Sequence, residues 1–172
     1  MKDSLVSICV NRHLSILSDE GIKLSPQARI LDFGCGKGEV VVEYRRRGFN
    51  SFGCDIEIPE DIIKLVGDDI LRKIDLNNYK IPFEDEYFDF IYSNQVFEHV
   101  QNYELACSEM ERVLKDGGCC LHVFPSKLKL IEPHIMVPLA GVIQKRWWLA
   151  IWAFLGIKNE FQKGASWLEV LC

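Results

Sequence analysis

Short apolar runs alternate with segments of helical periodicity between residues 29 and 124. The apolar runs predict strands at Arg29–Phe33, Ser51–Ile56, Asp69–Ile74, Phe88–Ser93 and Cys119–Phe124. The helical segments between them are Glu39–Arg47, which ends at Gly48, then Glu60–Val66 and Tyr103–Leu114, which ends at Gly117–Gly118. Strands and helices that alternate in this way build a mostly parallel sheet covered on both faces. The pattern therefore predicts a doubly wound α/β fold.

A further helix is predicted before the first strand, over Asp3–Glu20. Asp3 or Ser4 is suited to cap its first turn, because a short polar side chain there accepts from a free backbone N–H group. The apolar residues expected to share its buried face are Leu5, Ile8, Cys9, Ile16 and Leu17.

The C-terminal part contains a second apolar segment, Trp147–Ile157. It is shorter than the roughly 20 residues that a membrane-spanning helix needs, so no membrane span is predicted. Three interpretations stay open: a buried or oligomer-facing helix, a helix lying on a membrane surface, and a lid over an apolar substrate.

Composition narrows the class of protein. The chain has 172 residues, of which 48% are hydrophobic, and a formal net charge of −5. That length predicts one domain with its own core, and the acidic balance argues against nucleic acid as a partner. The seven cysteines are scattered and form no C-x-x-C pair, which argues against structural zinc and for a reducing, cytoplasmic location.

The most informative segment is ILDFGCGKGE, where a strand leads into Gly34, Gly36 and Gly38. Glycines at these positions let the backbone turn tightly and approach a ligand. The spacing G-x-G-x-G differs from the dinucleotide pattern G-x-G-x-x-G, and no phosphate loop is present. Asp32 would repel a pyrophosphate but suits an ammonium group. The loop therefore favours a ligand that carries a cation beside it.

Two later aspartates end predicted strands. Asp55 lies 21 residues beyond Gly34, where a carboxylate accepts from the hydroxyls of a ribose; the alternative is that it caps the following helix. Asp75 is placed to accept from an exocyclic amine, and the alternative is a solvated turn, because two asparagines follow. Asp68 and Asp69 compete with Asp75 for this role.

Together these residues resemble class I S-adenosylmethionine-dependent methyltransferases. The loop that ends in GCGKG is similar to the cofactor loop of that family. IPFEDEYFDFIYSNQVFEHV and MERVLKDGG are similar to two later family segments, with Asp116 where proline is usual. The resemblance covers residues 28 to 125, and among subfamilies it is closest to the group called methyltransferase type 11.

The resemblance implies a Rossmann-like fold, S-adenosylmethionine as cofactor, S-adenosylhomocysteine as product, and methyl transfer to a small-molecule, glycan-like or lipid-like acceptor. The residues that it implies at the cofactor are Asp32, Gly34, Cys35 and Gly36 at the amino-acid end, Gly38 at the helix start, Asp55 and Ile56 at the ribose and adenine, Asp75 and Leu76 at the adenine edge, and Asn94 and Gln95 near the sulfonium. No metal is implied.

Transfer of a methyl group to a neutral acceptor also needs a group that takes a proton. His99, Glu98 and His134 are candidates, and each has an alternative structural role. Two other functions stay open: a module that binds the cofactor without catalysis, and a nicotinamide-dependent enzyme, which the loop spacing and Asp32 disfavour.

The resemblance implies a division of the chain into an S-adenosylmethionine-binding core, residues 1–125, and a helical, tryptophan-rich segment of the same domain, residues 126–172. The family's sheet closes with a two-strand hairpin, for which residues 126–172 leave no room, so the hairpin is expected to be missing. All four tryptophans lie in this segment. It is therefore expected to form a lid, a substrate surface, a homodimer surface or a peripheral membrane contact.

Overall fold

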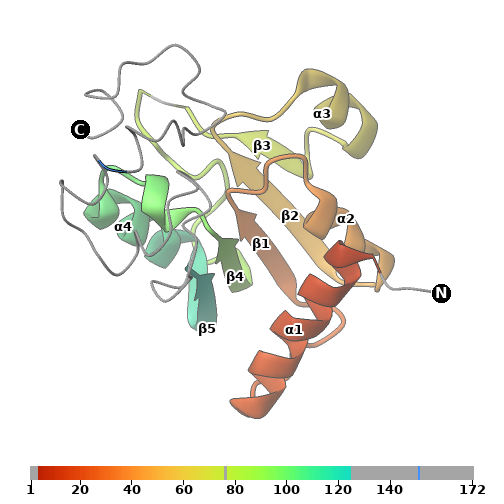
Figure 1. Cartoon of the computed structure of the whole chain (residues 1–172). Coiled ribbons are helices and arrows are strands. Elements are labelled where there is room, and N and C mark those ends of the chain that lie inside the picture. The colour runs from red at the N-terminus through yellow and green to blue at the C-terminus, as the bar shows by residue number, and fades with distance from the viewer. Residues whose placement is uncertain (1–3, 76, 125–150, 152–172) are drawn as a thin grey trace. The chain divides into compact units, whose positions relative to one another are not determined.

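The computed structural model describes residues 4–75, 77–124 and 151. Its five strands form one sheet in the order β3-β2-β1-β4-β5, and every neighbouring pair is parallel (Figure 1). The strands are β1 (Arg29–Phe33), β2 (Asn50–Asp55), β3 (Leu71–Lys73), β4 (Phe88–Asn94) and β5 (Leu114–Val123). The predicted α/β fold with a parallel sheet is confirmed.

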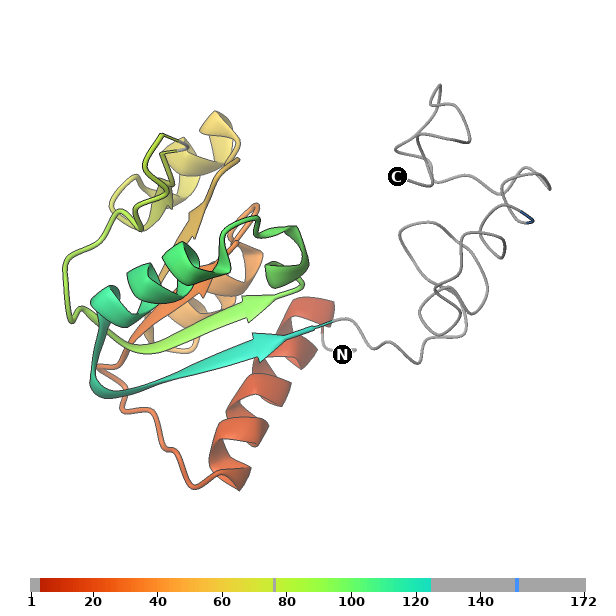
Figure 2. The ribbon, with the colours of Figure 1, turned by 90° about the vertical axis from the view of Figure 1, so that its left-hand side faces the viewer.

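Helices cover both faces of this sheet. They are α1 (Leu5–Asp19), α2 (Glu39–Arg46), α3 (Glu60–Val66), the short 3-10 helix η1 (Phe97–His99) and α4 (Tyr103–Val113). Figure 2 shows α4 in front of the sheet and α2 behind it. The core accordingly has one cluster that includes Met110 and Val113 of α4, and another that includes Val10 of α1 and Tyr44 of α2.

The order of the strands creates a crevice between β1 and β4. The chain runs outward from β1 through β2 to β3, and then returns to the other side of β1 as β4. In open α/β sheets, ligands bind at the carboxyl ends of the strands at such a reversal. Gly34 follows β1 there, and Asn94 ends β4 at the same edge.

The helix α1 and its cap are confirmed, and so is the burial of Leu17, but the rest of the predicted buried face is wrong. Ser4 accepts from the Ser7 amide at 3.1 Å. Leu5 and Ile8 are 86% and 52% exposed. The residues that α1 buries are Ser7, Val10, His13 and Leu17. The buried face contains two polar residues whose hydrogen bonds come from other elements, so a search for apolar positions missed it.

The boundary between α4 and β5 also differs from the prediction. The helix ends at Val113, and β5 begins at Leu114, so Gly117 and Gly118 lie within the strand element instead of ending the helix. Gly117 has a φ of +76°, and the register between β4 and β5 shifts between Phe88 and Phe90. The glycines therefore mark an irregularity in the strand, a common role for glycine in sheets.

The predictions for residues 126–172 concern the tryptophan-rich segment, the missing hairpin and the homodimer surface, and this segment lies outside the described residues except for residue 151. Leu76 and His134 also lie outside them. Within the described part of the chain, no helix is long and apolar enough to span a membrane.

Candidate cofactor and active site

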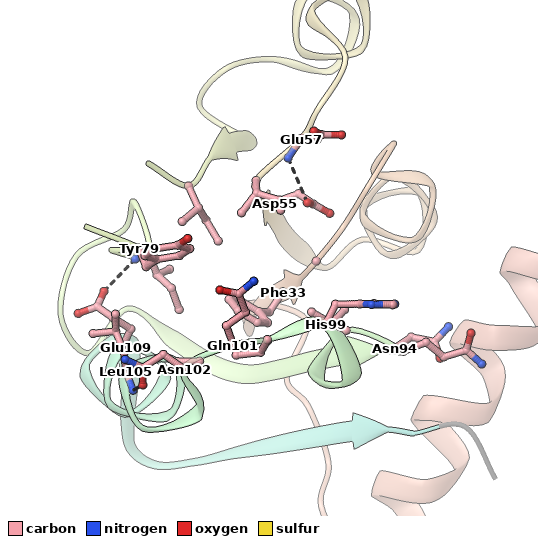
Figure 3. Close-up of a pocket in the computed structure, with 18 residues that line it drawn as sticks. Phe33, Asp55, Glu57, Tyr79, Asn94, His99, Gln101, Asn102, Leu105 and Glu109 are labelled. Atoms are coloured by element: carbon pink, nitrogen blue, oxygen red, sulfur yellow. Dashed lines mark hydrogen bonds between the residues drawn. The ribbon is translucent and has the colours of Figure 1, made fainter. Parts of the chain in front are cut away.

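A cavity of about 660 Å³ opens at the carboxyl ends of β1, β2 and β4. Its lining includes Gly34 after β1, Asp55 and Ile56 at the end of β2, and Asn94 and Gln95 at the end of β4. Figure 3 shows side chains from these strand ends, from η1 and from α4 around one space. The fold therefore brings five of the residues predicted at the cofactor to a single cavity.

The glycine loop turns sharply between β1 and α2. Gly34, Gly36 and Gly38 all have positive φ, between +52° and +82°, which L side chains rarely adopt. A Cβ at Gly34 would lie 2.3 Å from Val96, and one at Gly38 would lie 2.8 Å from Leu71. A Cβ at Gly36 would meet nothing within 4 Å. Gly34 and Gly38 thus allow close packing, whereas Gly36 borders open space that a ligand can enter.

Asp55 is bound to this loop. Its Oδ2 accepts from the Gly36 amide at 2.7 Å, and its Oδ1 accepts from the Glu57 amide at 3.2 Å. A carboxylate oxygen accepts more than one hydrogen bond, so both oxygens retain capacity toward the cavity. The helix-cap alternative does not describe Asp55, because Pro59 is the residue before α3.

Asp32 lies beneath the loop rather than in the cavity wall. It is 3% exposed and does not line the cavity. Burial raises the pKa of Asp32 to about 8; a hydrogen bond with Tyr92 opposes the rise and the charge of Asp55 adds to it. Cys35 does not line the cavity either, and its side chain lies close over Gly53 of β2. Burial raises the pKa of its thiol.

The end of β4 presents polar side chains to the cavity. Asn94 and Gln95 line it, and the Gln95 amide donates to the Val123 carbonyl at 2.8 Å. Gln95 has a φ of +55°, an uncommon conformation for a residue other than glycine. His99 of η1 also lines the cavity (Figure 3). The neighbouring Glu98 does not line it, and its two carboxylate oxygens are buried without a hydrogen-bond partner in the described part of the chain.

Asp75 is not brought to the cavity. Its Oδ1 accepts from the backbone amide of Asn77 at 2.9 Å, and its carbonyl accepts from the Tyr79 amide at 2.7 Å. It borders a separate, shallower pocket with Arg72 and Lys73. Asp75 therefore lies in a turn, which is the alternative that the sequence left open for it.

Several cavity residues were not anticipated. They are Phe33, Glu57, Tyr79, Ile81, Val100, Gln101, Asn102, Leu105, Ala106 and Glu109. One signal was available for Tyr79: six residues separate Asp75 from Pro82, which leaves room for the turn that carries Tyr79 to the cavity (Figure 3). For the α4 residues no local signal existed, because only the packing of the helix decides which side faces the strand ends.

Comparison with known proteins identifies the family. The profile described as "Methyltransferase domain" matches residues 31–122, more than half of the chain. The chain belongs to the methyltransferase-domain family. The resemblance to class I S-adenosylmethionine-dependent methyltransferases is thereby confirmed at the level of the family.

Among curated proteins, this methyltransferase domain is 33% identical over 107 residues to an uncharacterized methyltransferase of Schizosaccharomyces pombe, covering 54% of the chain and 38% of that protein. It is 31% identical over 105 residues to sterol 4-C-methyltransferase strm-1 of Caenorhabditis elegans, covering 58% of the chain and 31% of that protein. The chain thus spans less than half the length of these relatives.

Solved structures agree on the fold. An S-adenosylmethionine-dependent methyltransferase from Aquifex aeolicus superimposes with a TM-score of 0.54 at 18% identity, covering 83% of this chain and 76% of that one. In the described part of the methyltransferase domain, no cluster of His, Cys, Asp and Glu side chains is suited to hold a metal ion.

Proposed function

We propose that the chain binds S-adenosylmethionine at the carboxyl ends of β1, β2 and β4, and transfers its methyl group to a small-molecule acceptor. The observation that carries this proposal is the position of Asp55. Two backbone amides hold its carboxylate at the cavity edge, at 2.7 and 3.2 Å, and both oxygens can still accept. A ribose offers two neighbouring hydroxyl donors, which suits such a carboxylate.

The surrounding residues fit the rest of the cofactor. Ile56 is half exposed and lies beside Asp55, and Ile74 and Ile81 add apolar surface for a purine ring. Gly36 leaves open space beside the loop for the amino-acid end. Beneath that loop, burial raises the pKa of Asp32 to about 8, and a nearby ammonium group would favour the charged form of its carboxyl. The adenine contacts first assigned to Asp75 are better supplied by these apolar residues, because the Asp75 side chain is engaged in its own turn.

When bound, the cofactor supplies a methyl group that its sulfonium already activates, so the protein's own work is to orient the acceptor and remove water. Asn94 and Gln95 are placed to orient an acceptor at the end of β4. His99 is the candidate base, because it lines the same cavity whereas Glu98 does not. Its role is to take the proton from an acceptor hydroxyl or amine.

The mixture of polar and apolar residues in the cavity wall, rather than one specific contact, supports the acceptor class. A glycan-like or lipid-like small molecule suits a cavity whose wall near η1 combines the polar His99 and Gln95 with the apolar Val96 and Val100. The sterol methyltransferase relative supports the lipid-like choice. The scattered cysteines support a reducing location such as the cytoplasm.

The experiment is a calorimetric titration of the whole chain with S-adenosylmethionine, beside Asp55→Asn and Glu57→Gln. Both variants remove one carboxylate at the same cavity edge, but only the amide of Glu57 contacts Asp55. We expect Asp55→Asn to weaken binding by roughly 10- to 100-fold, the scale of a hydrogen bond to a charged group. Glu57→Gln should change it less than about threefold.

Two outcomes contradict parts of the proposal. If the folded chain does not bind S-adenosylmethionine, the cofactor assignment is wrong. If it binds the cofactor but methylates none of a panel of sterols, quinols, sugars and amines, the module that binds without catalysis is the better description. If His99→Ala transfers the methyl group as fast as the wild type, His99 is not the base, and the rest of the proposal is unaffected.

A further inference from the structure

A polar cluster lies inside the core between α1, α2 and the sheet. His13 of α1 is 2% exposed, and its Nδ1 lies 3.3 Å from the Tyr44 hydroxyl. The His13 ring packs on Tyr92 of β4, with 4.3 Å between the ring centroids. Tyr92 is in turn the register partner of Asp32 on β1, so the two buried side chains lie on the same face of neighbouring strands, and the Tyr92 hydroxyl lowers the pKa of the Asp32 carboxyl. Buried polar groups therefore connect the first helix of the chain to the carboxylate beneath the glycine loop.

This carboxylate has no cationic partner in the described part of the chain. None of the ion pairs found there includes Asp32. The titratable groups that face it are all acids or neutral donors: Cys9 of α1, Cys35 of the loop, Tyr44 of α2, Cys54 and Asp55 of β2, and Tyr92 of β4. A buried carboxylate without a cation is costly, and a ligand that brings a positive charge relieves that cost.

We propose that Tyr92 is a positioning residue that holds the Asp32 carboxylate, through its hydroxyl, for the ammonium group of the bound cofactor, and that His13 keeps the Tyr92 ring in place. The inference rests on the proposed function and deepens it, because it names the residue that prepares one end of the cofactor site. Tyr92 itself is 2% exposed and does not line the cavity, so it acts only through Asp32.

The physical role of the Tyr92 hydroxyl is to stabilise the charged form of Asp32. A phenol that donates to a carboxylate favours its charged form and lowers its pKa. This hydrogen bond works against burial, which raises the pKa of Asp32 to about 8. Burial, and secondarily Arg12, lower the pKa of His13 to about 4, so the ring stays neutral at physiological pH. Loss of the hydroxyl would leave Asp32 protonated to a higher pH and less able to bind a cation.

The experiment measures ligand affinity against pH for the wild type, Tyr92→Phe and Tyr44→Phe. S-adenosylhomocysteine is the probe, because it carries the same ammonium group and does not react. Titrations between about pH 6 and 9 define the acid limb, where affinity falls as Asp32 takes up a proton; the α-amino group of the ligand titrates near 8 and shapes the other limb. Methylthioadenosine, which lacks the amino-acid end, is the control ligand.

We expect Tyr92→Phe to move the acid limb to higher pH and to weaken S-adenosylhomocysteine about tenfold near pH 7, the scale of one hydrogen bond to a charge. Methylthioadenosine should bind both proteins equally. Tyr44→Phe removes a hydroxyl that contacts His13 and should leave the limb in place. 3-Fluorotyrosine at position 92 keeps the hydroxyl as a stronger donor, so it should move the limb to lower pH even if Tyr92→Phe does not fold.

Three results overturn the inference. An unchanged acid limb in Tyr92→Phe would show that the hydroxyl does not act on Asp32. Equal weakening of both ligands would assign Tyr92 a purely structural role. A limb that moves equally in Tyr44→Phe would mean that the effect is not specific to Tyr92. A wild type that binds neither ligand would instead overturn the proposed function, so the two failures are distinguishable.

Discussion

The two faces of the sheet differ in what they bury, and β1 contributes residues to both. Leu31 and Phe33 belong to the cluster under α4, which is apolar and rich in aromatic rings. Ile30 belongs to the cluster under α1 and α2, and on that face Asp32 is buried as the register partner of Tyr92, whose ring packs on His13. One face therefore contributes stability through packing, whereas the other also buries an acid whose pKa burial raises to about 8, so that its charged form destabilises the chain.

The face of the sheet under α4, called here the aromatic face, contributes to stability by packing. The Phe88 ring lies 5.0 Å from that of Phe83 and 5.9 Å from that of Phe52, both edge to face. The guanidinium of Arg72 stacks over Phe83 at 4.7 Å and donates to the Pro82 carbonyl at 2.8 Å. Arg72 thus has a ring and a carbonyl as partners, whereas Asp32 has no ion-pair partner in the part of the chain that the structure describes. This difference predicts that mutations on the two faces will separate stability from binding.

The largest effect should come from the aromatic face. Phe88→Ala removes a side chain that is fully buried among other rings, and we expect it to lower the free energy of unfolding by about 3–5 kcal/mol. Urea denaturation followed by circular dichroism measures the loss. Leu65→Ala on α3 is the control: Leu65 is 80% exposed, so its removal should change stability by less than about 0.5 kcal/mol. Similar losses in both variants would contradict the aromatic core.

The opposite sign is expected from Asp32→Asn. The pKa of Asp32 is about 8 in the folded chain and near 3.8 when it is unfolded, so the folded protein binds more protons between those values and loses stability as pH rises through them. Asparagine removes this penalty. The variant should be more stable than the wild type by about 1–3 kcal/mol above pH 8, scarcely different near pH 4, and weaker in binding S-adenosylmethionine.

Thermal unfolding at several pH values measures this, with Asp89→Asn as the control on β4. At Asp89, burial raises the carboxyl pKa, but hydrogen bonds from Lys115 and the Arg29 amide outweigh it and hold the pKa below its usual range. Asp89→Asn should therefore destabilise the chain at neutral pH. If both variants shifted stability in the same direction, the distinction between the two carboxylates would be lost.

His13 provides the next test on the same face. Burial lowers its pKa from 6.5 to about 4, so the unfolded chain binds more protons in that window. The stability that the neutral ring contributes is complete above pH 6.5 and is lost as pH falls toward 4. We expect a decline of about 1–2 kcal/mol in the wild type and a flatter profile in His13→Gln. An identical decline in both proteins would show that other groups control acid unfolding.

The smallest effects compare two helix caps on opposite faces. Ser4 accepts from the Ser7 amide at 3.1 Å to cap α1, and Asn102 accepts from the Leu105 amide at 3.0 Å to cap α4. Replacing either residue with alanine should cost about 1 kcal/mol. Only Asn102 lines the cavity, so only Asn102→Ala should also weaken the binding of S-adenosylmethionine. Equal affinities in the two variants would place Asn102 outside the binding site.

Local pattern predicted most of the fold. The strand at Arg29–Phe33 and the helix at Glu60–Val66 have the predicted boundaries, because short apolar runs and turn residues mark them unambiguously. The glycine loop and Asp55 could be identified as candidates because each stands at the end of a predicted strand. The α1 face was missed because His13 and Ser7 are polar in sequence but buried in the fold. Partners that make such burial acceptable come from elements distant along the chain.

The amino-acid sequence by itself determined the succession of strands and helices along the chain, the glycine loop after the first strand and the family to which the chain belongs. These features depend on side chains and spacings that are close together in the chain. Only the tertiary structure decided that Tyr92 lies in register with Asp32, that α4 lines the cavity, and that Asp75 closes its own turn. Register, helix rotation and hydrogen-bond partners arise from packing between distant segments, where burial, rather than residue type alone, sets the energy of each group.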